Sequence, residues 1–169
     1  MSDEILSPGW ALAKFEDLLI DPKADLVDGP FGSNLKSSEY IEAGVPVLKI
    51  QNIKADRFIR KHFSYVTKGK AAELSRHSFV PGDLIITKLG DPLGLCCEVP
   101  NDFPHGVFVA DLMRLRLRTN NISKRFVLLA INSQIVQDQF KQITKGTTRP
   151  RVNLTIVRSI TLALPPLPE

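Results

Sequence analysis

A basic loop near the C-terminal end of the chain holds the side chains best suited to bind an anion. It spans residues 144–153, reads TKGTTRPRVN, and places Lys145, Arg149 and Arg151 around a glycine and a proline. Arginine and lysine pair with phosphate or with the edge of guanine, and an asparagine such as Asn153 can read adenine. These residue types predict a contact with nucleic acid. A solvated basic turn is the alternative interpretation.

The charge of the chain is distributed unevenly. Residues 1–60 carry ten acidic and seven basic side chains, whereas residues 61–169 carry eight acidic and fifteen basic ones, so net charges of −3 and +7 sum to +4. A positive field of this size favours a polyanionic partner such as nucleic acid. This is a weak argument alone, because a basic isoelectric point is common among soluble proteins.

Two other turns carry polar side chains that could take part in the same contact. Residues 28–34 read DGPFGSN, a segment dense in turn formers that predicts a sharp bend and exposes Asn34 and Lys36. The segment PGDLIITKLG predicts a turn and a buried strand, with Lys88 at the tip of a β-hairpin whose second strand is GLCCEV. Each turn fits either a plain structural loop or a contact loop.

Two segments have the alternating pattern of a half-buried strand. Residues 45–53 (VPVLKIQNI) set Lys49, Gln51 and Asn52 against apolar positions, and residues 111–118 (DLMRLRLR) set three arginines against leucines. Period-two alternation puts the polar residues on one face of a strand. We expect both polar faces to be solvated. The alternatives are base reading by the amides of residues 45–53 and phosphate binding by the arginines of residues 111–118. The arginine face is therefore left outside the binding site.

Helical spacing appears mainly in the second half of the chain. The segment SKRFVLLAINSQIVQDQFKQI predicts two short consecutive helices that pack on the sheet, capped by Ser123 and by Asn132-Ser133. Residues 68–75 predict another short helix, and the final LALPPLPE predicts an edge strand ended by prolines. An aromatic anchor, Trp10, opens the core.

The motifs of the common enzyme classes are missing from the sequence. It contains no GxxxxGK[ST], GxGxxG, GxSxG or HExxH, and DPLG at residues 91–94 lacks the second proline and the aromatic of an (N/D)PPY methyltransferase motif. No second carboxylate lies beside Asp83 and Lys88 to form a nuclease metal centre. Cys96 and Cys97 are adjacent in an apolar run, which predicts buried, reduced thiols. We expect no catalysis, no cofactor and no metal site.

Length and hydropathy predict one cytoplasmic domain. At 169 residues the chain is long enough for one core and too short for two comfortable ones. No apolar run approaches the roughly 20 residues that cross a bilayer. The N-terminal MSDEILSPGW lacks the basic-then-apolar pattern of a signal peptide, so we expect no membrane contact.

The order of these segments carries a family resemblance. DGPFGSNLKSSEY, GVPVLKIQNI, FVPGDLIITKLGDPLG, the late helix ending in NSQ, KGTTRPRVNL and LPPLPE follow one another from about Trp10 to Glu169. In this order they resemble a target recognition domain of the DNA specificity subunit of a type I restriction-modification enzyme. The segments PGDLIITKLG, GTTRPRVNL and LPPLPE are the specific part of the resemblance.

The resemblance implies an α/β (α+β) domain with a twisted, mostly antiparallel sheet flanked by short helices. Such a domain carries no chemistry and reads one half of a bipartite site in double-stranded DNA, while methyltransferase subunits and a motor nuclease subunit assemble on the specificity subunit. Residues 1–169 would be a single recognition domain that ends where the spacer helix of the family would begin. We expect the isolated fragment to be monomeric.

The resemblance does not say which residues touch DNA, so the chemistry of the loops selects them. Lys145, Thr147 and Thr148 are the expected phosphate contacts, and Arg149 and Arg151 are the candidates for guanine or phosphate. A general nucleic-acid-binding domain and a protein-assembly domain remain the alternatives. The expected DNA-binding residues are Asn34, Lys36, Lys88, Lys145, Thr147, Thr148, Arg149 and Arg151.

Overall fold

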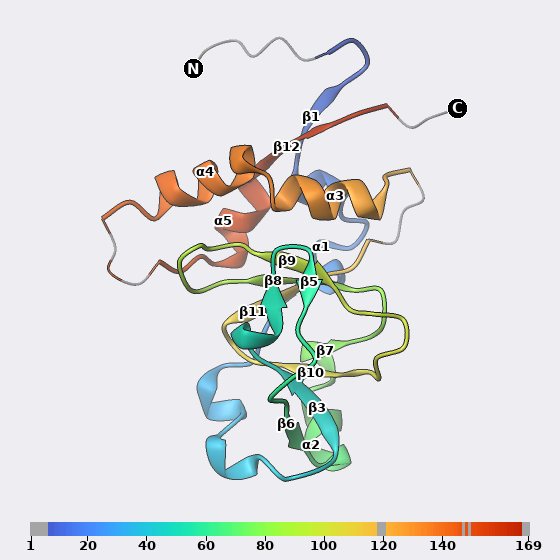
Figure 1. Cartoon of the computed structure of the whole chain (residues 1–169), viewed down its shortest axis with the longest axis vertical. Coiled ribbons are helices and arrows are strands. Elements are labelled where there is room, and N and C mark those ends of the chain that lie inside the picture. The colour runs from blue at the N-terminus through green and yellow to red at the C-terminus, as the bar shows by residue number, and fades with distance from the viewer. Residues whose placement is uncertain (1–6, 118–120, 147, 149, 167–169) are drawn as a thin grey trace.

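The structure, a computed structural model, describes residues 7–117, 121–146, 148 and 150–166, and two four-stranded sheets form its centre (Figure 1). The first sheet has the strand order β2-β11-β8-β9, and the second has the order β6-β3-β10-β7. The strands of the first sheet are β2 (Leu26–Asp28), β11 (Leu112–Leu115), β8 (Leu84–Thr87) and β9 (Cys96–Glu98). The strands of the second sheet are β6 (Ser64–Val66), β3 (Val45–Leu48), β10 (Gly106–Phe108) and β7 (Ser78–Phe79).

The first sheet is antiparallel and buried on both faces. Ile86 of β8 lies between Met113 of β11 and Cys96 of β9, and all three side chains belong to the apolar core on the helical face. Ile85 and Leu112 point to the opposite face and pack with the second sheet. Burial on both faces explains why β8 reads as an uninterrupted apolar run, as the sequence predicts for this strand.

The second sheet contains the one parallel pairing among the described strands. Val47 and Leu48 of β3 lie opposite Val107 and Phe108 of β10 in parallel register, and the other two pairings are antiparallel. The prediction of a mostly antiparallel fold with short helices is confirmed, although the strands form more than one sheet.

Helices cover the first sheet. α3 (Lys124–Ile131) and α4 (Gln134–Ile143) begin at the two predicted caps, since Ser123 and Ser133 accept hydrogen bonds from backbone N–H groups three residues later, at 3.2 and 3.5 Å. Their apolar sides complete the core above the sheet (Figure 1). None of the helices in the described ranges is long and apolar enough to cross a membrane.

Several shorter elements complete the fold. α2 matches the short helix predicted over residues 68–75, whereas α5 was not predicted. β1 and β12 form a two-stranded ribbon, which confirms an edge strand near the C-terminal end, and Trp10 is partly exposed beside it rather than within the core. These elements are α1 (Pro22–Asp25), α2 (Lys68–Glu73), α5 (Leu154–Ser159), β1 (Ala11–Lys14), β12 (Thr161–Leu164) and the hairpin β4 (Ile53–Lys54) with β5 (Arg57–Phe58).

The expectation of a solvated polar face over residues 45–53 is confirmed for Gln51, which is exposed, and is wrong for Asn52. β3 ends at Leu48, and a 3-10 turn over Ile50–Asn52 follows it. Asn52 is buried and donates to the backbone carbonyls of Ile59 (3.1 Å) and Lys61 (2.9 Å). The Asn52 amide therefore satisfies the backbone carbonyls of the following turn, and it is too buried to contact a ligand.

The solvated arginine face predicted for residues 111–118 is also wrong. Arg114 is only 4% exposed, and its guanidinium donates to two backbone carbonyls at 2.6 and 2.5 Å. Arg116 makes two hydrogen bonds of 2.7 Å to the carboxylate of Asp83. Both faces of β11 are covered, since Met113 and Leu115 pack in the core on the helical face and Leu112 packs in the core on the opposite face. Arg118 lies outside the described residues.

Both cysteines are free thiols in the core, as the sequence predicts. Cys96 packs on the helical face of the first sheet and Cys97 on the opposite face. Burial raises the pKa of Cys97 to about 12 and the pKa of Cys96 well above its ordinary value. Neither thiol is poised to react.

Candidate nucleic-acid interface

Four loops meet at one end of the first sheet. β2 and β8 both run antiparallel to β11, so their last residues lie at the end where β11 and β9 begin. We call the surface that these loops form the loop face. Its described residues are 28–36, 88–95, 109–111, 144–146, 148 and 150–153.

Backbone hydrogen bonds hold the basic loop against this end of the sheet. The Val152 N–H donates to the Lys88 carbonyl (3.0 Å), and the Gly90 N–H donates to the Pro150 carbonyl (3.2 Å). Leu89 and Arg151 form an isolated antiparallel bridge. The basic loop is therefore anchored at its C-terminal half, next to the loop that follows β8.

The same network reaches the other two loops. The Lys88 N–H donates to the Asp111 carbonyl (2.8 Å), and the Gly29 N–H donates to the Leu112 carbonyl (3.0 Å). Segments widely separated in sequence thus share one hydrogen-bonded framework. In Figure 1 the light-blue segment after β2 lies at the lower left, and the segment after α4 lies at the upper left.

Lys88, predicted at the tip of the hairpin, is part of this framework and is largely buried. Its side chain is 9% exposed, and Nζ donates to Asp28 Oδ2 at 3.1 Å. The hairpin β8–β9 exists as predicted, but Lys88 lies where β2 and the basic loop close over it. The local sequence of the hairpin contains no pattern that predicts these contacts of Lys88 with distant segments.

Arg151 occupies the border between framework and solvent. It forms an ion pair with Asp111, and its side chain is 50% exposed. Exposed ion pairs of this kind contribute about 0–1 kcal/mol, so the guanidinium can exchange the carboxylate for a phosphate or a base edge at small cost. The sequence pattern identified Arg151, but nothing in it pointed to Asp111 as a partner.

Lys145 and Thr148 are exposed in the outer part of the basic loop. Gly146 between them has a φ of +85° with open space around its Cα, a conformation that other residues adopt reluctantly. Two further predicted contacts, Thr147 and Arg149, lie outside the described residues. Of the predicted group in this loop, the structure therefore describes three residues, Lys145, Thr148 and Arg151.

Asn153 has a structural task instead of the predicted role in reading a base. Its Oδ1 accepts a hydrogen bond from the Ile156 N–H (2.9 Å) and so caps α5. The sequence does hold a signal for this helix, since an asparagine before LTIV is a preferred N-cap. The helix α5 was missed because the segment was interpreted as a loop followed by a strand.

Asn34 and Lys36 are exposed on the loop that follows β2, as predicted. Asn34 ends a 3-10 turn over Gly32–Asn34, and its N–H donates to the Phe31 carbonyl (2.8 Å). The Lys36 N–H donates to Glu39 (2.6 Å). A hydrogen bond from Lys70 and then this backbone bond lower the pKa of Glu39, so its carboxylate stays charged.

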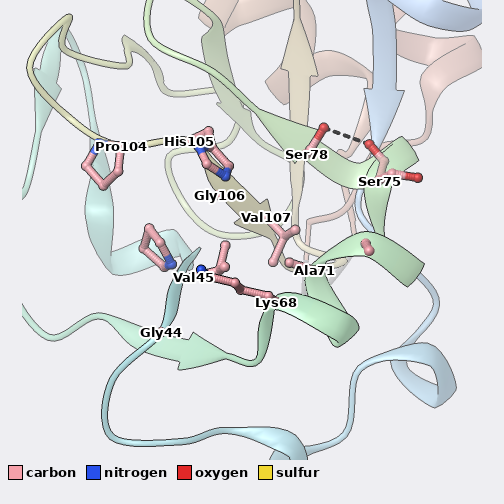
Figure 2. A pocket seen from close by; sticks show the side chains of 12 residues that line it. Gly44, Val45, Lys68, Ala71, Ser75, Ser78, Pro104, His105, Gly106 and Val107 are labelled. Atoms are coloured by element: carbon pink, nitrogen blue, oxygen red, sulfur yellow. Dashed lines mark hydrogen bonds between the residues drawn. The ribbon is translucent and has the colours of Figure 1, made fainter.

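A cavity of about 740 Å³ lies elsewhere, between α2 and the second sheet (Figure 2). Its lining is mostly apolar and includes Val45, Ala71, Pro104 and Val107, with Lys68 among the residues at its border. None of its lining residues belongs to the loop face. The cavity therefore has no part in the proposed nucleic-acid contact.

Comparison with known proteins gives distant relatives of one kind. No family model matches the chain. The type I restriction enzyme MjaVIII specificity subunit of Methanocaldococcus jannaschii is 22% identical over 158 residues, which cover 91% of this chain and 37% of that protein. The chain thus spans little more than a third of this relative.

Solved structures show the same architecture. The HsdS subunit of Thermoanaerobacter tengcongensis matches with a TM-score of 0.62 and 17% identity, covering 98% of this chain and 36% of that one. A chain from a study of complex assembly and conformational transition in the type I R-M system matches with a TM-score of 0.68, also at 17% identity, over 98% of this chain and 36% of its own length.

A third solved structure is similar in the same way. The S subunit of the type I restriction-modification system of M. genitalium matches with a TM-score of 0.58 and 12% identity, over 92% of this chain and 34% of that chain. The resemblance to type I specificity subunits that the sequence motifs predict is therefore confirmed, together with the mixed helix-and-sheet fold.

Proposed function

We propose that this chain, which shares the fold of type I specificity subunits, is a non-catalytic DNA-recognition domain that reads a short sequence of double-stranded DNA. The observation that carries the proposal is the convergence of the basic loop with the loop after β2 on one end of the sheet. Together they present amide, hydroxyl and cationic side chains on one surface. The names of the relatives, specificity subunits, support the same reading.

The side chains of the loop face divide into two tasks. Lys145, Thr148 and Lys36 are suited to phosphates, which fix the position of the duplex without reading its sequence. Arg151 and Asn34 can make paired hydrogen bonds to guanine and adenine edges, each worth about 1–3 kcal/mol of discrimination. Two further residues are proposed from sequence alone: Thr147 as a phosphate contact and Arg149 as a base-reading residue.

Two of the three acidic residues at the loop face, Asp28 and Asp111, are paired with cations and are therefore compatible with a polyanionic ligand. Asp28 binds Lys88, and Asp111 binds Arg151. Each carboxylate holds a cation in a defined place, so its own charge is largely offset. We propose that Lys88 acts through Asp28 to position the loop after β2 and does not contact DNA itself.

The wider role of the chain is also a proposal. As a recognition domain it would read one half of a bipartite site and direct methyltransferase and nuclease subunits of a type I complex in the cytoplasm. The second half-site would need a second reader, and the longer relatives have room for one, since this chain covers little more than a third of each. Alone, the chain would bind weakly, since many phosphate contacts would be missing.

The test is a selection from a randomised duplex library at low salt, followed by a salt titration of the selected duplex. We expect enrichment of one motif of roughly three to five base pairs and an affinity that falls steeply as salt rises. Lys145→Ala should reduce the slope of log K against log salt by about one. The control Lys54→Ala removes an exposed positive charge outside the loop face and should leave the slope unchanged.

Two results would favour the alternative functions. Binding without enrichment, weakened alike by Lys145→Ala and Lys54→Ala, would indicate a general polyanion-binding domain. Absence of binding to any duplex at low salt would leave a protein-assembly domain.

A further inference from the structure

Phe31, at the tip of the loop after β2, is the most exposed large apolar side chain in the described part of the chain, at 83%. The chain has nine phenylalanines, and the other eight are buried or partly buried. A single apolar side chain on a surface needs no explanation by itself. The loop that carries Phe31 makes this one different.

The loop holds Phe31 outward on a fixed base. Gly29 donates to the Leu112 carbonyl (3.0 Å), and a Cβ at this position would lie 2.0 Å from the Val109 carbonyl oxygen, so only glycine fits. Pro30 is buried, and its ring restricts the backbone directly before Phe31. A ring presented this way loses little conformational entropy when a partner covers it.

The position of Phe31 ties it to the loop face. Asn34 and Lys36 are exposed on the same loop. Asp28, at the start of this loop, is held by Lys88, whose carbonyl accepts the Val152 N–H of the basic loop (3.0 Å). The apolar ring is therefore set in a surface whose other members suit phosphates and base edges.

We propose that the Phe31 ring stacks on a base of the bound duplex, at a step that the contact partly unstacks. The inference rests on the proposed DNA recognition and assigns to that surface an aromatic contact with a base. Apolar side chains inserted between base steps, and aromatic rings stacked on bases, are established means of binding DNA. Such a contact adds affinity without neutralising a phosphate.

A protein partner fits Phe31 less well than DNA does. The core of a protein interface gathers several apolar side chains, whereas the exposed neighbours of Phe31 are Gly32, Ser33 and Asn34. An apolar surface of the former kind does occur on this molecule, around Trp10, at the hollow between β12, α3 and α4. Phe31 is isolated from it on a polar and cationic loop.

The first test compares affinity and salt dependence on a duplex that the parent chain binds. We expect Phe31→Ala to weaken binding about tenfold with an unchanged salt slope, because stacking releases no counterions. Phe31→Trp should keep the affinity within about threefold of the parent, since indole also stacks. Lys36→Ala should instead reduce the slope by about one.

A matched control separates this contact from a general loss of apolar surface. Leu12 is 65% exposed on β1, outside the loop face, so Leu12→Ala should bind like the parent. Thermal unfolding of each variant establishes that it is folded. Parental affinity of Phe31→Ala, an equal loss in Leu12→Ala, or a loss of affinity that comes with a lower salt slope would each overturn the proposal.

The second test reports the contact directly. In a Trp10→Phe background, Phe31→Trp leaves one indole, and stacking on a base should quench its emission when a saturating duplex is added. The parent chain, whose single tryptophan is Trp10, supplies the control and should keep its emission. Unchanged emission from the tryptophan at position 31 in a saturated complex would overturn the stacking.

The two proposals fail in different ways. If the parent chain binds no duplex, DNA recognition and the Phe31 contact both fail. If the parent binds and Lys145→Ala lowers the salt slope while Phe31→Ala changes nothing, only the stacking contact fails.

Discussion

Lys88 and Asp28 are 60 residues apart in the sequence, and the Lys88 Nζ donates a hydrogen bond to Asp28 Oδ2 at 3.1 Å. Their strands, β8 and β2, are not neighbours, because β11 lies between them. The pair therefore spans a strand and fixes the distance between two of the loops that form the loop face.

Removing Asp28 from this pair should destabilise the fold more than removing Lys88. We expect Asp28→Asn to lower the free energy of unfolding by about 1–3 kcal/mol, because it leaves a buried ammonium without its carboxylate. Lys88→Met removes the charge and keeps an apolar stem, so its cost should be smaller. Urea denaturation followed by circular dichroism measures both. If Asp28→Asn lowered the free energy of unfolding no more than Lys88→Met does, the ion pair would contribute little to stability.

The contact between Gly29 and β11 should be intolerant of any side chain. A Cβ at Gly29 would lie 2.0 Å from the Val109 carbonyl oxygen, whereas a Cβ at Gly32 would meet nothing within 4 Å. We expect Gly29→Ala to lower the free energy of unfolding by about 2 kcal/mol or more, since backbone must move. Gly32→Ala is the control and should stay within about 0.5 kcal/mol of the parent. Similar melting curves for the two variants would contradict the described packing.

Releasing Arg151 from its carboxylate should strengthen binding to DNA. Asp111→Asn removes the ion-pair partner of Arg151 and one negative charge from the loop face. We expect about two- to fivefold tighter binding at low salt, with the gain shrinking as salt screens the charge. Asp102→Asn breaks an exposed ion pair to Arg60 outside the loop face and serves as the control. Equal effects of the two substitutions would place Arg151 outside the interface.

The buried thiols should make the fold less stable at alkaline pH. Burial raises the pKa of Cys97 to about 12, whereas a thiol in the unfolded chain ionises near pH 8.5, at about the usual value. A raised folded pKa gives stability that is complete below the unfolded pKa and is lost as pH rises toward the folded one. Unfolding free energies of the parent should therefore fall from about pH 8.5 upward.

Cys97→Ala isolates this effect, because every other titrating group stays in place. Its stability should decline less steeply between pH 8 and 10 than that of the parent in matched urea titrations. Parallel declines would assign the alkaline loss to other groups.

The sequence predicted best what depends on local chemistry. The serine caps of α3 and α4, the buried strand β8 and the exposed turn with Asn34 and Lys36 all follow from residue types within a few positions. The helix α5 could have been found in the same way, because Asn153 is a recognisable cap.

Burial of a side chain by segments distant in the sequence could not be predicted from the sequence alone. Alternation in residues 111–118 indicates a strand with two unlike faces, but it does not reveal that both faces of β11 are covered and that Arg114 is buried. The burial of Lys88 likewise depends on segments that are distant in the sequence. Its pairing with Asp28 depends on a strand order that no local pattern encodes.

The main-chain anchoring of the basic loop has a consequence for how such a surface can diversify. The bonds from Val152 and Gly90 and the bridge between Leu89 and Arg151 join backbone to backbone, so they do not depend on which side chains the outer loop carries. Substitutions at positions 145–148 can therefore change the chemistry presented to a ligand while the scaffold keeps its shape. If the loop face binds DNA as proposed, exchange of a few residues in the outer loop would change the sequence that it prefers without changing the fold.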